Sequence, residues 1–305
     1  MRASKAMRLR ALIEALAEYP DDGRLWMGWD AAGVDVISDM NIHAILVEPA
    51  LPSAIPTEYD YLYSDNPSDN SAYSLAEFAG ICVNKAYKTY FNVGDKIKIV
   101  PHTEVFADSE IVMRVIGYNH YKLSDGSGEF AGVVFEMVGV MHSSMPIHNA
   151  ITNVGGWPIT TLRSYFNDTV YPELPQNWKA LIKEVEVIST SGNSSTDIVS
   201  CNDKLFSLCA AEMYAEAAIT VPYEFEVDPD ADEITFSVYT DRNSCVKKTF
   251  NGKGSAVEYW LRSPRSVSQT KFVYVPTKGT ETYSKEEFFY KGNTISQYVC
   301  FAFCM

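Results

Sequence analysis

The stretch that decides the fold begins with Tyr259-Trp260-Leu261-Arg262-Ser263-Pro264, and it closes on Val299-Cys300-Phe301-Ala302-Phe303-Cys304, almost at the last residue. Two apolar blocks therefore enclose a segment rich in Tyr, Ser, Thr and Lys. Buried strands that hold a polar and aromatic surface between them are typical of a recognition module rather than of a catalytic centre. The sequence thus predicts a binding role and does not specify the ligand.

The charge of the 305-residue chain is acidic but uneven. The net charge is -14, and residues 251–305 hold seven Lys/Arg and four Glu, a balance of +3 that leaves -17 on the first 250 residues. Because nucleic-acid binding needs clustered Lys and Arg, nucleic acid is not an expected partner. We expect either an ordinary solvated acidic protein or a C-terminal face suited to an anionic or polar partner.

Neither a membrane span nor a secretory signal is predicted. No stretch reaches the roughly 18 uninterrupted apolar residues that a membrane span needs. Arg8, Arg10 and Glu14 interrupt the place where the apolar core of a signal peptide should lie. The six cysteines include no CxxC pair, so neither a zinc site nor a redox motif is indicated, and no cofactor is expected.

Residues 1–73 are predicted to form a separate N-terminal region. Leu9, Leu12, Leu16 and Tyr19 follow a helical spacing, which predicts a helix over 4–19 that docks on its own domain or on a neighbouring subunit. Two short strands are expected next, at 34–37 and 42–47. The polar, turn-rich residues 57–73 indicate a linker or a long loop.

The main domain is predicted to begin at Ser74, where Ser74-Leu75-Ala76-Glu77 forms a capping box that opens a helix to about Tyr90. Gly155-Gly156-Trp157-Pro158 begins a second helix, with Pro suited to the first turn, and a third covers about 176–182. A hairpin turn is expected at Asp125-Gly126-Ser127-Gly128. The patterns predict strands at 93–100, 111–117, 132–141, 185–188, 204–208 and at the chain end.

Residues 216–240 have the composition of an insertion, because they are acidic and contain proline. Strands are expected within them at 223–227 and 234–238. Short strands with two central helices and a final strand at the chain end predict an α+β fold class.

Four blocks of the sequence resemble a known family. They are Val93-Gly94-Asp95 with Val115-Ile116-Gly117-Tyr118-Asn119-His120, then Asn153-Val154-Gly155-Gly156-Trp157 through Arg163-Ser164-Tyr165-Phe166-Asn167, then Asp203-Lys204-Leu205-Phe206-Ser207-Leu208, and finally the Tyr259–Pro264 block with Phe301–Cys304. In this order they resemble an uncharacterised domain family of gut bacteria and their bacteriophages, over roughly residues 90–305.

The resemblance implies a C-type-lectin-like fold of the formylglycine-generating-enzyme type, over 74–305 with the insertion at 216–240. Related folds in phages and in diversity-generating retroelements display variable C-terminal residues for host or ligand recognition. Residues 1–73 would then attach the chain to other virion subunits. The implied location is the virion, after synthesis in the cytoplasm of a host bacterium, and a homo-oligomer is expected.

The resemblance also bears on catalysis. A formylglycine-generating enzyme needs a closely placed copper-binding cysteine pair. Cys300 and Cys304 are the only near pair, and their spacing in a strand keeps the two sulfurs apart. No Gly-x-Ser-x-Gly motif is present. Glycosidase carboxylates could lie anywhere among 39 acidic residues, so this signal is weak, and the sequence predicts no enzyme.

No metal site is predicted. The spacing of six between His142 and His148 matches no standard zinc pattern, and with His120 they are expected to be structural. Asp228-Pro229-Asp230-Ala231-Asp232 resembles the start of a calcium loop. Glu233 and Tyr239 occupy the places that require Gly and Glu.

The implied fold projects the residues between Trp260 and the last strand from one exposed face. Trp260 and Arg262 themselves belong to the family block, so they are expected to be scaffold, with Arg262 paired to a buried acid or to carbonyls. Phe272, Val273 and Val275 are expected in the core. The candidate ligand-binding residues are Arg265, Ser266, Ser268, Gln269, Lys271, Tyr274, Tyr283, Phe288, Tyr290, Asn293, Ser296 and Tyr298.

Three functions follow from these expectations. The first is a phage virion surface or tail protein whose C-terminal domain binds a host-surface ligand, either a glycan or a protein. The second is a structural virion subunit, for capsid decoration or tail assembly, without ligand binding. A bacterial surface lectin is the third, and the lack of a recognisable signal peptide disfavours it.

Overall fold

The structure is a computed structural model that describes residues 51–52, 61–64, 71–101, 104–106, 110–193, 195–217, 223–249, 251–265, 268–279 and 290–305. The helix and strands expected before residue 50 lie outside the described residues. Of the described residues, 51–52, 63–64 and 71–86 belong to a smaller compact unit, and 61–62 and those from Tyr87 onward belong to a larger one. The continuous part of the larger unit starts at Tyr87, 13 residues after Ser74, the domain start expected from the sequence.

The capping box predicted at Ser74 and Glu77 is confirmed. Ser74 precedes α2 (Leu75–Val83), and the Glu77 carboxylate accepts a hydrogen bond from the Ser74 N–H at 2.9 Å. The helix ends before the expected Tyr90 because Lys85 has a φ of 54°, which a right-handed helix does not contain. A separate short helix, α3 (Tyr87–Tyr90), follows in the larger unit.

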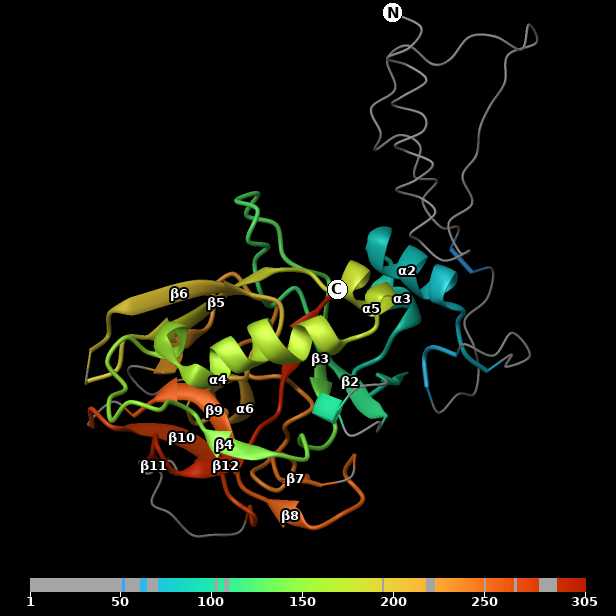
Figure 1. Cartoon of the computed structure of the whole chain (residues 1–305). Helices are drawn as coiled ribbons and strands as arrows, with labels where there is room; N and C mark the ends of the chain where they lie inside the picture. The colour runs from blue at the N-terminus through green and yellow to red at the C-terminus, as the bar shows by residue number, and fades with distance from the viewer. Residues whose placement is uncertain are drawn as a thin grey trace, which may run out of the picture. The chain divides into compact units, whose positions relative to one another are not determined.

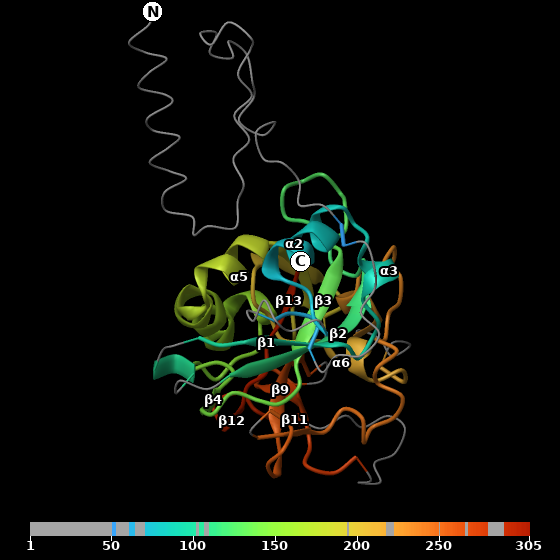
Figure 2. The same ribbon diagram turned by 90° about the vertical axis from the view of Figure 1, so that its right-hand side faces the viewer.

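The first sheet of the larger unit has the strand order β1-β2-β3-β13, and all its neighbours are antiparallel (Figures 1 and 2). β3 is buried along its whole length, so this sheet lies within the core. The predicted strands of this region are confirmed, with shorter bounds at some ends. They are β1 (Lys96–Ile99), β2 (Ile111–Tyr118), β3 (Val133–Met137) and β13 (Ala302–Cys304).

The second sheet has five strands in the order β11-β10-β9-β12-β4. Its central strand β9 is the quoted Tyr259–Pro264 block, and all six of its residues are buried. The core positions expected at Phe272, Val273 and Val275 are confirmed, because each side chain has 0% exposure. The other strands are β4 (Ser144–Pro146), β10 (Lys271–Val275), β11 (Tyr290–Gly292) and β12 (Ser296–Tyr298).

A run of short helices follows the strand β4 of the second sheet in sequence. Of the apolar stripe expected from the helical spacing, Leu162, Phe166 and Val170 are fully buried and Tyr165 is half-buried, and Trp157 at the start of the run is also fully buried. In Figure 1 the run lies between the strands β5 (Val185–Thr190) and β6 (Ile198–Asp203) and the second sheet. It comprises η3 (Trp157–Ile159), α4 (Thr161–Ser164), the π-helix η4 (Tyr165–Val170), η5 (Tyr171–Glu173) and α5 (Gln176–Leu181).

Two small antiparallel ladders complete the described strands, β5 (Val185–Thr190) with β6 (Ile198–Asp203) and β7 (Lys247–Lys248) with β8 (Ala256–Val257). The strand expected at 204–208 is wrong, because β6 ends at Asp203 and Phe206 makes only an isolated bridge to Ala302. A short helix, α6 (Ala210–Met213), follows. The larger unit is a mixed α+β structure, as predicted.

The two strands expected within 216–240 are also wrong. The first falls on the 3-10 helix η6 (Tyr223–Glu226) and the second on turns. The segment is not a peripheral addition, because Tyr223, Glu226 and Phe236 are at most 1% exposed. The alternation of apolar and polar residues in this segment resembles that of a strand, but its buried side chains are held by contacts with residues far away in the sequence.

One further short 3-10 helix, η2 (Glu104–Phe106), precedes β2.

Candidate functional site

Three loops meet at one end of the second sheet, and we call them the loop platform: residues 148–154, 268–270 and 293–296. The Asn153 N–H donates to the Gln269 carbonyl at 2.6 Å, which joins the first loop to the second. The Asn293 N–H donates to the Thr270 carbonyl at 3.0 Å, and the Asn293 carbonyl accepts from the His148 N–H at 3.2 Å. The backbone alone therefore connects all three loops.

Two buried asparagine side chains fix the same loops. Asn153 has 0% exposure, and its amide donates to the carbonyls of Ser268 at 2.6 Å and Lys271 at 2.9 Å. Asn293 has 1% exposure, and its amide donates to the Thr152 carbonyl at 2.8 Å and to the Ala150 carbonyl. Buried backbone carbonyls need partners, so these amides make the irregular loop conformations stable.

The platform presents both apolar and polar side chains to solvent. Ile151 is 75% exposed, Val154 49% and Ile295 48%. A single exposed apolar residue is ordinary, but three on one set of connected loops indicate a contact surface. Exposed polar residues accompany them, namely Asn149, Gln269, Thr294 and Ser296.

Apart from Asn293, five of the candidate ligand-binding residues lie on or beside the platform, and one of them is the exposed Ser296. Gln269 is exposed, and Arg265, Ser268 and Lys271 are half-buried around the turn between β9 and β10. This turn is closed by the hydrogen bond from the Arg265 N–H to the Lys271 carbonyl at 2.9 Å.

Other candidates fall elsewhere. Asn293 was expected on the exposed face, and that expectation is wrong, because its amide is used inside the platform. Ser266, Tyr283 and Phe288 lie outside the described residues, and so does the side chain of Tyr290, whose backbone belongs to β11.

Tyr274 and Tyr298 are both half-buried, but they do not share a face. The strand register places Tyr274 opposite Trp260 and Tyr298 opposite Tyr259. Successive residues of a strand point to opposite faces, so these two tyrosines lie on opposite faces of the second sheet. The expectation of a single face is therefore wrong for this pair.

Beside Tyr274 lies a small charged group. The Lys291 amine is 4.7 Å from the centroid of the Tyr274 ring, and it forms an ion pair with Glu258. Lys291 and Glu258 are each less than one third exposed, so the Lys291 stem and the tyrosine ring cover part of this face.

The scaffold role expected for Arg262 is confirmed. Its guanidinium is fully buried and forms a bidentate ion pair with Glu212, at 2.7 and 2.8 Å. It also donates to the carbonyls of Ile188 at 3.0 Å and Ser207 at 2.9 Å. The neighbouring Trp260 is buried as well, and its indole N–H donates to the Met145 carbonyl at 3.0 Å.

The titratable groups of the interior have structural partners. Burial opposes ionisation of Glu212, but the Arg262 guanidinium and His120 outweigh it and hold the pKa of Glu212 well below its usual range. Glu226 differs, because burial raises its pKa to about 7 although Ser263 and Thr190 donate hydrogen bonds to it. The Cys300 thiol is also buried, which raises its pKa to about 12.

The cysteines and histidines show similar structural roles. The six cysteines, all of which the structure describes, form no disulfide, and four of them are buried. The His120 ring lies 3.1 Å from the Glu212 carboxylate, whereas His148 lies 3.2 Å from the Thr161 hydroxyl. These histidines therefore do not converge, and in the described part of the chain no group of three His, Cys, Asp or Glu residues is placed to hold a metal ion.

In the segment that resembles a calcium loop, the carboxylates of Asp228 and Asp230 form ion pairs with a lysine, Lys122. The Lys122 amine lies 2.8 Å from the Asp228 carboxylate and 3.4 Å from that of Asp230. The Lys122 ammonium group supplies the positive charge that a metal ion would supply in a calcium loop.

Sequence reasoning did not identify Asn153, Ile151 or Ile295 as platform residues. Asn153 lies in the quoted Asn153–Trp157 block, but the pattern there indicated only the beginning of a helix. The local sequence gives no sign that its amide bonds to carbonyls 112–118 residues away.

Within the described residues no helix is both long enough and apolar enough to cross a membrane.

Comparisons with known proteins place the chain in a family. The chain has no significant match among curated proteins or among solved structures. A family model matches residues 131–294, just over half of the chain, and this range includes all of the second sheet except β12, together with most of the platform. The chain therefore belongs to the family described as a domain of unknown function, DUF6273.

Proposed function

We propose that the protein is a bacteriophage virion surface or tail protein whose C-terminal domain, of C-type-lectin-like fold, binds a ligand on the host surface. The observation that carries this proposal is the loop platform. Its three loops are fixed to one another by Asn153 and Asn293, so their exposed side chains are held in place before a ligand arrives. A surface ordered in advance loses less conformational entropy on binding.

The chemistry of the platform suits a protein or glycan surface. Ile151, Val154 and Ile295 offer apolar area that can cover a side chain or the face of a sugar ring. The amides of Gln269 and Asn149 add donors and acceptors in the same loops. The role proposed is binding without catalysis, which agrees with the use of Glu212 and Arg262 as a buried structural pair.

The order of the four sequence blocks supports the lectin-like fold and the virion location. The N-terminal residues 1–73 would attach the domain to other virion subunits, and a homo-oligomer would present several platforms together. An experimental structure of the domain in complex with its ligand would test the fold assignment and the platform at once.

The alternative role is a structural virion subunit, and one observation favours it. Ile151 is 75% exposed, and an apolar side chain so exposed also suits a permanent contact with another subunit. Immunogold labelling of intact particles separates the two roles. Labelling at the tail tip or on fibres supports host binding, whereas uniform labelling of the shell supports the structural role.

A binding experiment tests the platform itself. Fluorescently labelled protein is applied to a glycan array and to envelope fractions of gut bacteria, and bound protein is titrated to obtain a Kd. Ile151→Asp places a charge in the centre of the proposed contact, and we expect it to weaken binding at least tenfold. Ile234→Asp is the matched control, because Ile234 is also exposed, at 43%, and belongs to a different part of the larger unit.

The two variants must show the same thermal melting as the native protein for the comparison to count. Equal affinity of Ile151→Asp and native protein, with both folded, would contradict the proposal. So would a loss of binding of the same size in Ile234→Asp.

A further inference from the structure

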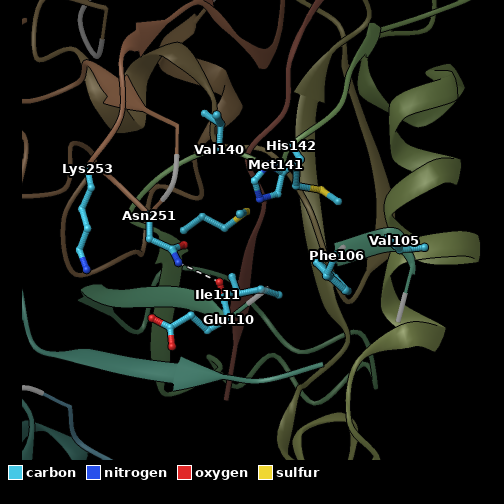
Figure 3. Close-up of a pocket in the computed structure, with 10 residues that line it drawn as sticks. Val105, Phe106, Glu110, Ile111, Val140, Met141, His142, Asn251 and Lys253 are labelled. Carbon is cyan, nitrogen blue, oxygen red and sulfur yellow. Dashed lines mark hydrogen bonds between the residues drawn. The ribbon is translucent and has the colours of Figure 1, made fainter. Parts of the chain in front are cut away.

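A second candidate site, which shares no residue with the loop platform, is a pocket of about 290 Å³ next to the first sheet (Figure 3). Asn251 and Lys253 border it on one side and Val105 and Phe106 on the other. The volume is close to the lower end of the range that small-molecule sites occupy.

Most of the pocket wall is apolar. Ile111 begins β2, Met137 ends β3, and Val140 and Met141 follow β3, so two adjacent strands supply this wall. All four side chains are at most 5% exposed. Methionine side chains are flexible and polarizable, which lets such a wall adapt to ligands of different shape.

The turn that carries Asn251 is held firmly against the strands. The Asn251 side chain donates to the Glu110 carbonyl at 2.8 Å (Figure 3), and it accepts from the Val112 N–H at 3.3 Å. Gly139 allows the close approach, since a Cβ there would lie 2.8 Å from the Lys248 carbonyl oxygen. The turn that borders the pocket is therefore fixed to the start of β2 and to the segment after β3.

The charges at the pocket are unequal. Among the described residues that line the pocket only Glu110 has a carboxylate, and this group already pairs with Lys98 at 2.7 Å. Lys253 is exposed at the rim and makes no ion pair with any residue that the structure describes. A lysine with no paired acid beside an apolar cavity favours an anionic group on the ligand.

We propose that this pocket binds a small molecule with an apolar body and a carboxylate head. The apolar body lies against Ile111, Met137 and Met141, and the carboxylate faces the Lys253 amine. This inference is independent of the proposed host-binding role of the platform.

Saturated fatty acids and their alcohol and amine analogues are suitable probes, because the chain length and the head group can be varied separately. Hexanoate, octanoate, octanol and octylammonium are titrated into the full chain at one ionic strength, by isothermal calorimetry and ligand-observed NMR. Octanoate should bind saturably, and its affinity should exceed that of hexanoate by about fourfold per added methylene group. Octanol should bind more weakly than octanoate, and octylammonium more weakly still.

Two variants test the assignment to this pocket. Lys253→Gln should weaken octanoate binding about two- to fivefold and leave octanol unchanged, as expected for an exposed ion pair. Lys183→Gln, an exposed lysine outside the pocket, is its matched control and should have no effect. Ile111→Phe adds volume inside the cavity and should abolish binding of both probes in protein that melts at the native temperature.

The proposal is overturned if octanoate shows no saturable binding to the native chain. It is equally overturned if octylammonium binds as tightly as octanoate, or if Lys253→Gln and Lys183→Gln have the same effect.

Discussion

At the scale of single residues, the pKa values of two buried carboxylates near Arg262 are shifted in opposite directions. Glu212 forms the bidentate ion pair with the guanidinium, so its pKa is held well below the usual range. Glu226 offers the guanidinium only its backbone carbonyl, at 3.1 Å, and its own carboxylate meets Ser263 and Thr190. Hydroxyl and amide donors do not offset the burial of a full charge, so the pKa of Glu226 rises.

The raised pKa of Glu226 predicts a pH-dependent stability. Because the folded-state pKa is about 7 and the unfolded value is 4.5, the folded protein binds the extra proton between these values. The contribution of this group to stability is therefore full below about pH 4.5, and it is lost as the pH rises through 7, by about 3 kcal/mol in all.

Glu226→Gln removes this titration without changing the shape of the side chain. Urea denaturation at a series of pH values from 5 to 8 should show that the variant becomes the more stable protein as the pH rises. A constant difference between the two proteins across this range would show that Glu226 does not titrate there.

At the scale of elements, the helical run depends on a close approach of backbones at Gly156. This residue precedes η3 with a φ of 63°, and a Cβ there would lie 2.1 Å from the Thr190 carbonyl oxygen at the end of β5. The Gly-Gly-Trp block of the sequence is thus a packing requirement, because only glycine lets the start of η3 touch β5.

Alanine substitution at two glycines separates the energetic cost of a steric clash from the cost of an unfavourable backbone conformation. Gly94→Ala should cost about 1–2 kcal/mol, because its φ of 99° is unfavourable for a side chain but the space around it is open. Gly156→Ala should cost about 1–3 kcal/mol more than that, because it adds a clash with Thr190. Chemical denaturation measures both. Equal losses of stability in the two variants would mean that β5 shifts at no cost to make room for the methyl group that Gly156→Ala adds.

At the scale of the whole molecule, the larger unit depends on contacts between residues far apart in the chain. The segment 216–240 is the clearest case. Its acidic composition is that of an insertion, but the centroid of its buried Phe236 ring lies 4.3 Å from that of the His120 ring, and the Glu226 carboxylate accepts hydrogen bonds from Thr190 of β5 and Ser263 of β9. The acidic composition of the segment therefore does not reveal that part of it belongs to the core.

Two phenylalanines of this segment provide a matched test. Phe236→Ala should destabilise the larger unit by about 3–5 kcal/mol, because Phe236 is fully buried and the substitution leaves a cavity. Phe225→Ala should cost less than about 1 kcal/mol, because Phe225 is 38% exposed. Thermal and urea denaturation measure the two values. If both variants were nearly neutral, the segment would be the peripheral insertion that its composition indicates.

The sequence by itself determined the features that depend on neighbouring residues. The Ser74 capping box, the apolar strands β2, β3 and β9, and Pro158 in the first turn of η3 all follow from local geometry and from the period of the apolar positions. The need of Arg262 for buried acceptors also follows from the sequence, since a guanidinium inside an apolar block must find partners.

Only the tertiary structure decided which loops meet. Asn153 reaches carbonyls 112–118 residues away, and Asn293 reaches back to Ala150 and Thr152, so no local pattern encodes the loop platform. The same holds for the close approach of Asn251 to Gly139 and its hydrogen bond to the Glu110 carbonyl beside the pocket. A hydrogen bond between distant segments needs only one amide and one carbonyl brought together by the packing of the sheets, and such a pair has no periodicity in the chain.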